Sequence, residues 1–347
     1  MEEVLAKRDS SGIKFRDLIT FVLVFALCLL FVFGCDGSFE AIGRGDRDVK
    51  RGSNREEALS LIREGLSDSE PQVRAQAIEV VADVRVVELM PKVQRLLKDD
   101  FVPVRFAAAV AVGDVEYYLA KESVRLLLRD VDENVRIAAS YALVRLGSSS
   151  ELLSLRKAAR SADQTVRANA VWLIGKSGDK GSVDLLNLVR NSEDSEAKVR
   201  FQAAEAVARL GDEGIYTKLW TMLISKYIDN RIMGVKAMGA LGSREGKNAL
   251  ITMLDDEILE VRLSAAEQLG MLGYNFGEAE VFDVFTQGLT SGLGEIEAVK
   301  VKVLTALAIG QIGTERLAAE LPGLLKDRSK FVRIAAAKAV LQLEKGK

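Results

Sequence analysis

From residue 55 onward, the pattern of apolar and polar residues repeats with a period of about 31 residues. The clearest marker of each repeat is a basic residue, in most units directly after a valine, which we call the anchor. Successive anchors are 31 residues apart, except for one interval of 33 and one of 40. Such regularity over nine units predicts a repeat architecture, in which each unit buries its apolar face on its neighbours. The anchors are Arg74, Arg105, Arg136, Arg167, Arg200, Arg231, Arg262, Lys302 and Arg333.

Two further positions divide each repeat into two helices. In six units an aspartate stands six residues before the anchor, where its carboxylate can accept hydrogen bonds from free amides near a helix start. In six units a glycine stands eleven residues after the anchor, where it suits the left-handed residue that ends a helix. No period-two alternation competes, so each unit predicts a helix, an aspartate turn, a second helix and a glycine stop. The aspartates are Asp68, Asp99, Asp130, Asp194, Asp256 and Asp327, and the glycines are Gly147, Gly178, Gly211, Gly242, Gly273 and Gly313.

The second helix of each unit has a polar stripe. Positions three, seven and ten after the anchor are apolar almost throughout, whereas positions two, five and nine share one narrow stripe and are the most polar. We therefore expect this stripe to be exposed to solvent. In most units position five holds Glu or Lys, as a solvated face should. These residues are Glu79, Glu205, Lys236, Glu267 and Lys338.

Three consecutive units depart from this polar stripe and form the candidate binding surface. Their position five is apolar or aromatic, and position nine of the neighbouring units is basic. Because Tyr, Trp and Arg are enriched in interface hot spots, the sequence predicts a partner-binding strip here. The alternative is that Tyr141 and Trp172 lie flat against the adjacent helix and cover its alanines. The candidates are Val110, Tyr141, Arg145, Asn169, Trp172, Lys176, Gln202 and Arg209.

Two units differ in length or ending. The 40-residue interval before Lys302 contains nine extra residues within 274–298, which predict a longer first helix or a projecting loop such as 290–295. The last unit has no glycine stop and ends in a polar stretch. We expect that stretch to cap the C-terminal end of the repeat array.

The aspartate turn, the Val-Arg pair and the Ala-Ala-Leu-Gly pattern resemble HEAT repeats, particularly the short type of phycobilisome-lyase-like proteins. The resemblance extends over about 290 of the 347 residues. It implies an all-α fold, a right-handed α-solenoid of about nine helix pairs whose second helices line the concave side. It also implies a ladder of Asp and Arg between repeats, so that Asp99 and Arg105 are structural groups and not catalytic ones.

The N-terminal residues match an export signal. Residues 18–33 form an uncharged apolar run behind Lys14 and Arg16, and the run is shorter than the roughly 20 residues that span a membrane. The following "VFGC" resembles the bacterial lipoprotein signal, which implies that Cys35 is acylated, although Phe33 is bulkier than usual there. The alternative is an uncleaved signal anchor with Cys35 as an ordinary thiol. The predicted division is a signal peptide or anchor over 1–34, a flexible spacer over 35–54 and a solenoid over 55–347.

Composition excludes several classes of chemistry. The chain has no histidine, so histidine-dependent triads and zinc sites are not expected. Its two cysteines, Cys28 and Cys35, both precede the repeats and cannot crosslink them. The formal net charge is −2, which opposes nonspecific binding of nucleic acid. We expect no catalytic residue, no metal and no cofactor.

These observations favour a binding protein over an enzyme. We expect a monomeric, non-enzymatic scaffold of the bacterial cell envelope that binds protein partners on its concave face and is tethered to the membrane. Asp36, directly after Cys35, resembles an inner-membrane retention signal and indicates the outer face of the cytoplasmic membrane. The alternative is a lyase-like or other enzyme-associated HEAT protein that acts on a bound cofactor or protein substrate. An iron-dependent hydroxylase of the deoxyhypusine type would need His-Glu pairs.

Overall fold

A computed structural model describes residues 45–345 of the chain, with side chains from 54 to 344. All regular secondary structure in this part is helical. The predicted export signal, Cys35 and the first half of the predicted spacer lie outside the described residues. Among the helices that are described, none is both long enough and apolar enough to cross a membrane.

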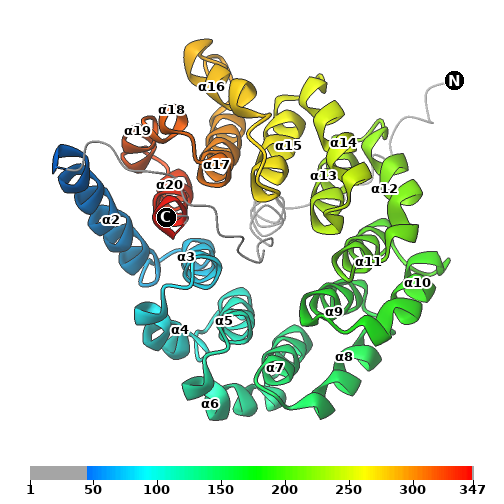
Figure 1. The fold of residues 1–347 in the computed structure, drawn as a ribbon. Helices are drawn as coiled ribbons and strands as arrows, with labels where there is room; N and C mark the ends of the chain where they lie inside the picture. Colours follow the sequence, from blue (N-terminus) through cyan, green and yellow to red (C-terminus); the bar gives the residue numbers. More distant parts are fainter. Residues whose placement is uncertain (1–44, 346–347) are drawn as a thin grey trace, which may run out of the picture.

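The helices form nine consecutive pairs arranged in a ring (Figure 1). The first helix of each pair lies on the outside and the second lines the inside, as the sequence predicts for a HEAT α-solenoid. The outer helices are α2 (Gly45–Gly65), α4 (Met90–Leu96), α6 (Lys121–Leu126), α8 (Leu152–Ala158), α10 (Val183–Asn191), α12 (Tyr216–Leu223), α14 (Arg244–Thr252), α16 (Glu278–Thr286), and α18 (Glu315–Ala318) with α19 (Leu321–Leu325). The inner helices are α3 (Pro71–Asp83), α5 (Val102–Val115), α7 (Glu133–Arg145), α9 (Gln164–Ser177), α11 (Ala197–Arg209), α13 (Ile228–Leu241), α15 (Leu259–Met271), α17 (Glu295–Ile312) and α20 (Lys330–Lys345).

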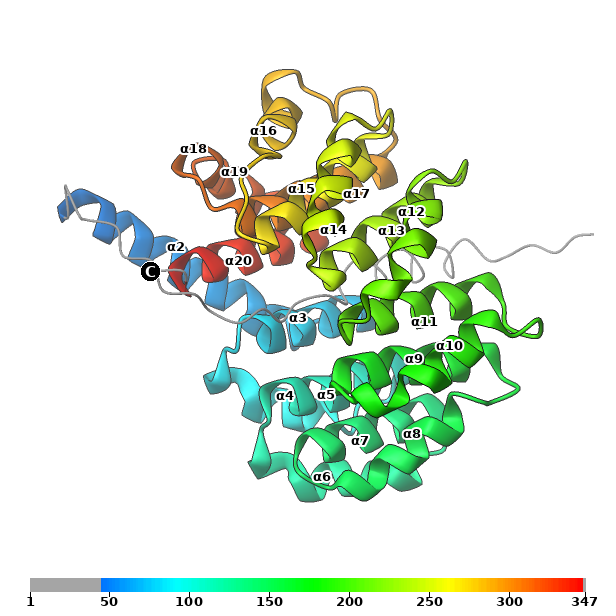
Figure 2. The same cartoon turned by 45° about the vertical axis from the view of Figure 1, so that its right-hand side comes forward.

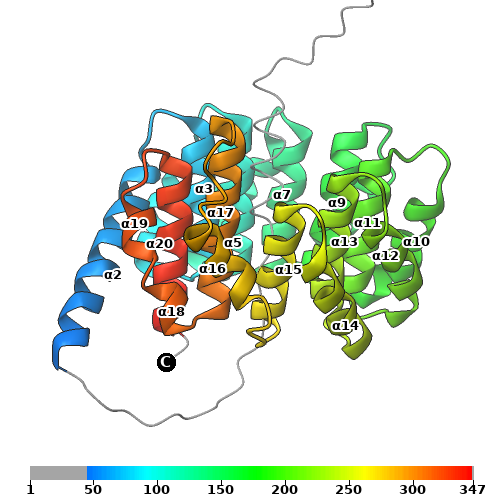
Figure 3. The ribbon, with the colours of Figure 1, turned by 90° about the horizontal axis from the view of Figure 1, so that it is seen from above.

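Short 3₁₀ turns flank most outer helices, so the first half of each of these repeats is a short α-helix with a 3₁₀ turn at one or both ends. The inner helices pack side by side around the ring (Figure 3). Gly175 of α9 illustrates this packing, because a Cβ there would lie 2.7 Å from the Ala206 Cβ of α11. The turns are η1 (Val87–Leu89), η2 (Tyr118–Ala120), η3 (Leu127–Arg129), η4 (Ser149–Glu151), η5 (Lys180–Ser182), η6 (Glu213–Ile215) and η7 (Met253–Asp255).

The predicted aspartate turns and glycine stops of the repeats are confirmed. Asp99 accepts a hydrogen bond from the Phe101 amide (3.0 Å), and Asp256 accepts one from the Ile258 amide (2.9 Å), so each closes the turn before an inner helix. The predicted glycine stops all have positive φ, and Gly178 is the left-handed C-terminal cap of α9. Local chemistry therefore fixes where the inner helices begin and, in six repeats, where they end.

An Arg–Asp ladder joins neighbouring repeats, as the resemblance implied. The Arg105 guanidinium donates from Nε to Asp130 Oδ2 (2.8 Å) and from Nη2 to Asp130 Oδ1 (3.0 Å), and both side chains are nearly buried. A matching two-point contact joins Arg74 to Asp99. The arginine and aspartate side chains of these pairs therefore connect neighbouring repeats. Further contacts of this kind are Arg167–Asp194, Arg231–Asp256 and Lys302–Asp327.

The first and last repeats contact each other and close the ring, which the sequence analysis did not predict. Helix α20 packs against α2 and α3 of the first repeat and against α17 of the preceding one (Figure 2). At this junction Lys330 Nζ donates to Asp68 Oδ1 (3.0 Å), and Lys338 Nζ donates to Asp83 Oδ2 (2.7 Å). The expected polar cap was therefore wrong, because α20 is an internal helix with neighbours on both sides.

Two segments differ in detail from their predictions. The insertion lengthens the second helix of its pair, α17, and adds a turn over 287–294 in which Gly288 and Gly292 have positive φ. The 291–297 stretch is exposed, as expected for a projecting loop, whereas the alternative of a longer first helix is wrong. Helix α2 begins at Gly45, so residues 45–54 of the predicted flexible spacer are helical. Extending a formed helix costs far less than starting one.

Candidate functional site on the inner wall of the ring

The polar stripe of the inner helices is largely buried, so its predicted exposure was wrong. Tyr141 and Lys338 are each 1% exposed, and Glu267 and Lys236 are also buried. The ring curves so tightly that inner helices two repeats apart touch one another. Trp172 of α9 stacks on Phe106 of α5 past the intervening α7, with ring centroids 6.4 Å apart. We call the residues at positions two, five and nine of the inner helices the inner wall.

Tyr141 takes the packing role that the alternative interpretation gave it. Its hydroxyl donates to Asp114 Oδ1 (2.5 Å). Its ring lies against Gly113 of α5, where a Cβ would be 2.9 Å from Tyr141 Cε1. Burial and then the negative charge of Asp114 raise the pKa of Tyr141 well above its usual value. The side chain is therefore a fixed part of the wall and does not project toward a partner.

The basic residues predicted beside this aromatic strip are paired with carboxylates. Lys176 Nζ donates to Asp114 Oδ2 (2.8 Å). Their partners hold them in place, so the strip has balanced charges and is not a free basic patch. The other pairs are Arg145–Glu116 (2.5 Å) and Arg209–Glu205 (2.8 Å).

The two amide candidates lie partly buried on the same wall. Asn169 Nδ2 donates to Asn134 Oδ1 of α7 (2.9 Å), which ties α9 to its neighbour. Gln202 of α11 has a buried Oε1 without a hydrogen-bond partner. Asn169 thus has a packing role.

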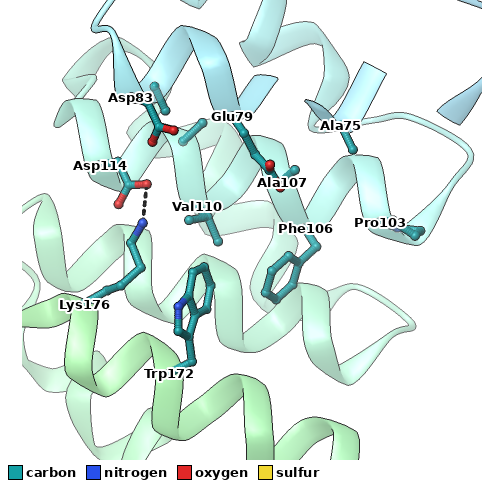
Figure 4. A pocket seen from close by; sticks show the side chains of 12 residues that line it. Ala75, Glu79, Asp83, Pro103, Phe106, Ala107, Val110, Asp114, Trp172 and Lys176 are labelled. Atoms are coloured by element: carbon teal, nitrogen blue, oxygen red, sulfur yellow. Dashed lines mark hydrogen bonds and ion pairs between the residues drawn. The ribbon is translucent and has the colours of Figure 1, made fainter. Parts of the chain in front are cut away.

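A pocket opens between α3, α5 and α9, and it gathers three of the predicted residues: Val110, Trp172 and Lys176 (Figure 4). Its volume is about 70 Å³. Phe106 and Trp172 form an aromatic wall on one side, and Lys176 Nζ lies 5.0 Å from the centre of the Trp172 ring. This arrangement combines aromatic faces with charged groups, a combination that recognises cations. We call it the α3–α5–α9 pocket.

Three carboxyl groups line the same pocket, those of Glu79, Asp83 and Asp114. Burial, reinforced by the nearby charge of Asp83, raises the pKa of Glu79 well above its usual value. Burial also raises the pKa of Asp83, although Lys338 opposes the shift. Burial lowers the pKa of Lys338, but the charge of Asp83, its hydrogen bond and the charges of Glu267 and Glu79 together outweigh burial, so the net shift is upward. The pocket thus concentrates titratable groups in a desolvated place.

Sequence reasoning missed the acidic half of this pocket. Asp83 and Asp114 occupy position nine, the same position that holds the basic residues of the following repeats, so the pattern contained the signal. Glu79 was taken for a solvated residue, and Phe106 lies at position one, outside the stripe. Lys338 reaches the pocket only because the ring closes.

A second pocket, with a volume of about 230 Å³, lies at the start of α14. Arg244, Lys247 and Tyr274 contribute to it, and Tyr274 stacks on the exposed Phe276 with ring centroids 5.5 Å apart. Within the described part of the chain, no group of three or more His, Cys, Asp or Glu side chains is arranged to hold a metal ion.

Comparison with known proteins agrees with this fold. A family model of HEAT repeats matches residues 59–143 and 152–227, so these two segments are HEAT repeats. No curated protein sequence matches the chain.

Several solved structures are similar to this chain at low identity. The complex of CpcE and CpcF of phycocyanin lyase from Nostoc sp. PCC7120 is 18% identical, with 80% of this chain and 98% of that chain covered and a TM-score of 0.43. Human deoxyhypusine hydroxylase in complex with glycerol is 16% identical, with 86% and 99% covered and a TM-score of 0.36. A structure of Kap95p and RanGDP is 14% identical, with 86% and 46% covered and a TM-score of 0.35. Likenesses this distant carry no functional conclusion for this chain.

Proposed function

We propose that this protein is a non-enzymatic scaffold that binds a protein partner through the inner wall of its HEAT ring. The α3–α5–α9 pocket is the observation that carries this proposal. There Trp172 and Phe106 stand beside carboxylates on three rigid helices that neighbours hold on both sides. Tryptophan in a largely desolvated pocket is the usual centre of a protein-binding hot spot. Repeat arrays present such groups on a long preorganised surface.

We further propose that the scaffold is tethered at the cell envelope, on the outer face of the cytoplasmic membrane. The apolar run over 18–33 and the "VFGC" sequence support the tether, and Asp36 after Cys35 supports the address. A single acyl chain binds membranes only weakly, so a stable anchor at Cys35 needs more than one chain. Cys35→Ser should abolish incorporation of labelled fatty acid and leave the precursor uncleaved. Equal labelling of the wild type and the variant would rule out acylation at Cys35.

Affinity capture from native membranes with matched tryptophan variants tests the binding function. Trp172→Ala should weaken capture of the partner by about 2 kcal/mol, roughly 30-fold in Kd. Trp220 is the matched control, because it lies on the outer helix α12 and stacks on the nearby Tyr216 (6.5 Å). Trp220→Ala should leave capture unchanged.

Folding must be separated from binding in this test, because Trp172 is only 7% exposed. Trp172→Phe keeps an aromatic ring in the wall, and binding is compared per folded molecule after measurement of Tm and circular dichroism. If Trp172→Ala unfolds the ring while binding per folded molecule stays the same, Trp172 is a packing residue and the proposed surface is wrong.

A further inference from the structure

The α3–α5–α9 pocket contains one more carboxyl group than it has cationic partners. Asp83 accepts a hydrogen bond from Lys338 (2.7 Å), and Asp114 accepts one from Lys176 (2.8 Å). Glu79 is left over, since its Oε2 atom is buried and has no hydrogen-bond partner. A buried carboxyl oxygen without a partner costs free energy, which a donor from outside the chain would recover.

The aromatic wall of the pocket already holds a cation against a ring face. Lys176 Nζ lies 5.0 Å from the centre of the Trp172 ring, while Phe106 continues the aromatic surface toward α3 (Figure 4). The rings of Phe106 and Trp172 are inclined by only 25°. A planar cation can stack on such a surface and still direct its N–H groups at a carboxylate in its plane.

The size and access of the pocket limit what can enter it. A volume of about 70 Å³ holds the planar end of one side chain, and it is well below the 300 Å³ or more that is typical of sites for whole small molecules. Pro103, at the start of α5, is exposed and lies at the end of the pocket away from Lys176 (Figure 4). A long, thin side chain therefore has a route from the edge of the ring to Glu79.

We propose that the α3–α5–α9 pocket binds the guanidinium group of an arginine side chain on the protein partner. The guanidinium donates to Glu79 and stacks on Phe106 and Trp172, while Lys176 and Lys338 stay paired with their own carboxylates. This assignment rests on the proposed function, because the arginine belongs to the protein that the scaffold binds. Arginine fits better than lysine, since its planar fork both stacks and forms two parallel hydrogen bonds with one carboxylate.

Arginine binding should release a proton. In the free pocket, Glu79 faces the carboxylates of Asp83 and Asp114 and the ammonium groups of Lys176 and Lys338. Burial raises its pKa well above the usual value, so Glu79 keeps its proton to a higher pH than an exposed glutamate does. An adjacent guanidinium favours the ionised form and lowers that pKa again. The proton therefore leaves Glu79 for solvent as the cation enters.

A fluorescence titration tests this assignment without the partner. The chain has two tryptophans, so Trp220→Phe leaves Trp172 as the only indole reporter. The full-length Trp220→Phe protein is titrated with N-acetyl-arginine amide, with N-acetyl-citrulline amide as the neutral control of the same shape, and with N-acetyl-lysine amide. We expect a saturable change with the arginine compound, none with the citrulline compound and a weaker one with the lysine compound. Protons should appear in weakly buffered solution only with the arginine compound.

A pair of matched variants identifies the carboxyl group responsible. Glu79→Gln should lower the affinity for the arginine compound at least ten-fold and abolish proton release. Glu122→Gln changes a carboxylate on the outer helix α6, which is paired with Arg125, and should leave the affinity unchanged. Circular dichroism confirms that both variants are folded.

The outcomes separate this inference from the proposed function. An equal response to the citrulline compound, a preference for the lysine compound, or unchanged affinity in Glu79→Gln would each overturn the guanidinium site. If the arginine compound binds as expected but membrane capture yields no partner that depends on Trp172, the pocket stands and the proposed scaffold function fails. If the partner binds normally to Glu79→Gln, the pocket is not where it docks.

Discussion

Lys330 of the last repeat donates a hydrogen bond to Asp68 of the first repeat, with 3.0 Å between Nζ and Oδ1. Asp68 has the same place in its repeat as Asp130, which accepts hydrogen bonds from Arg105 of the preceding repeat. The last repeat thus contacts the first repeat in the way that each ladder repeat contacts the next one along the chain. Lys330 takes the place of the anchor here, whereas Arg333 donates to backbone carbonyls of its own turn, as Arg105 also does. The array therefore has no free end at α20.

Breaking the Arg–Asp ladder should destabilise the repeat junctions. Arg105→Ala removes a two-point, nearly buried contact and leaves Asp130 without its guanidinium partner. We expect a loss of about 3 kcal/mol in the free energy of unfolding, measured by urea denaturation. Arg125→Ala is the control, because its pair with Glu122 is largely exposed and is worth less than about 1 kcal/mol. Equal losses in the two variants would show that the ladder does not hold the repeats together.

Acid should weaken the ladder. Burial raises the pKa of Asp130, but the hydrogen bonds that this carboxylate accepts from Arg105 and the Asp132 amide outweigh burial. Its pKa is therefore lower than usual. A carboxyl with a lowered pKa stabilises the fold above its unfolded pKa of about 3.9, and this stability is lost as pH falls through the lower folded value. Asp130→Asn should therefore destabilise the protein at pH 7, with a smaller difference in Tm from the wild type as the pH falls below 4.

Glu79 should behave in the opposite way. Its pKa is raised, so the folded protein holds a proton that the unfolded chain releases, and stability falls as pH rises from about 4.3 toward the folded value. Glu79→Gln removes this cost. We expect its Tm to equal that of the wild type near pH 4 and to exceed it increasingly toward pH 8. A variant that is less stable than the wild type at pH 8 would mean that ionised Glu79 is already compensated in the free protein.

The close approach of α9 and α11 should make Gly175 hard to replace. A Cβ at this position would lie 2.7 Å from Ala206 Cβ and 2.8 Å from Ala206 Cα, so backbone would have to move. Gly175→Ala should lower the free energy of unfolding by about 1–3 kcal/mol, as in other overpacked cores. Gly323→Ala in α19 meets no atom within 4 Å and should stabilise the protein by about 0.5–1 kcal/mol. Thermal unfolding of both variants checks the contrast.

The parts of the structure that depend on local chemistry were predictable from the sequence. The turn at Asp99 and the stop at Gly178 follow from residue types at fixed spacing, whereas the contact between Arg105 and Asp130 was implied by the resemblance to HEAT repeats. The contact between Lys338 and Asp83 follows from neither, because it joins residues 255 positions apart. It depends on the small rotation between successive pairs, which adds up over nine repeats and which no single repeat specifies.

The same curvature explains the errors at the candidate site. Helical periodicity places Tyr141 and Glu79 correctly on the stripe that faces away from the apolar core of each repeat. Periodicity cannot show that this stripe meets other helices across the inside of the ring. Charged residues such as Lys338 were therefore assigned to solvent, although paired carboxylates allow them to be buried.

Closure of the ring is the central claim, and intramolecular crosslinking tests it most directly. Cysteines are introduced at Glu70 and Lys330, whose side chains meet across the junction (2.8 Å), in a background with Cys28→Ser and Cys35→Ser. A short bifunctional maleimide should join them within one chain at high dilution, as identified by mass spectrometry. A pair at Glu70 and Glu193, near α3 and on the turn between α10 and α11, should not react. If the Glu70–Lys330 pair forms no crosslink, or forms one only between chains, the solenoid is open and the closed inner wall does not exist.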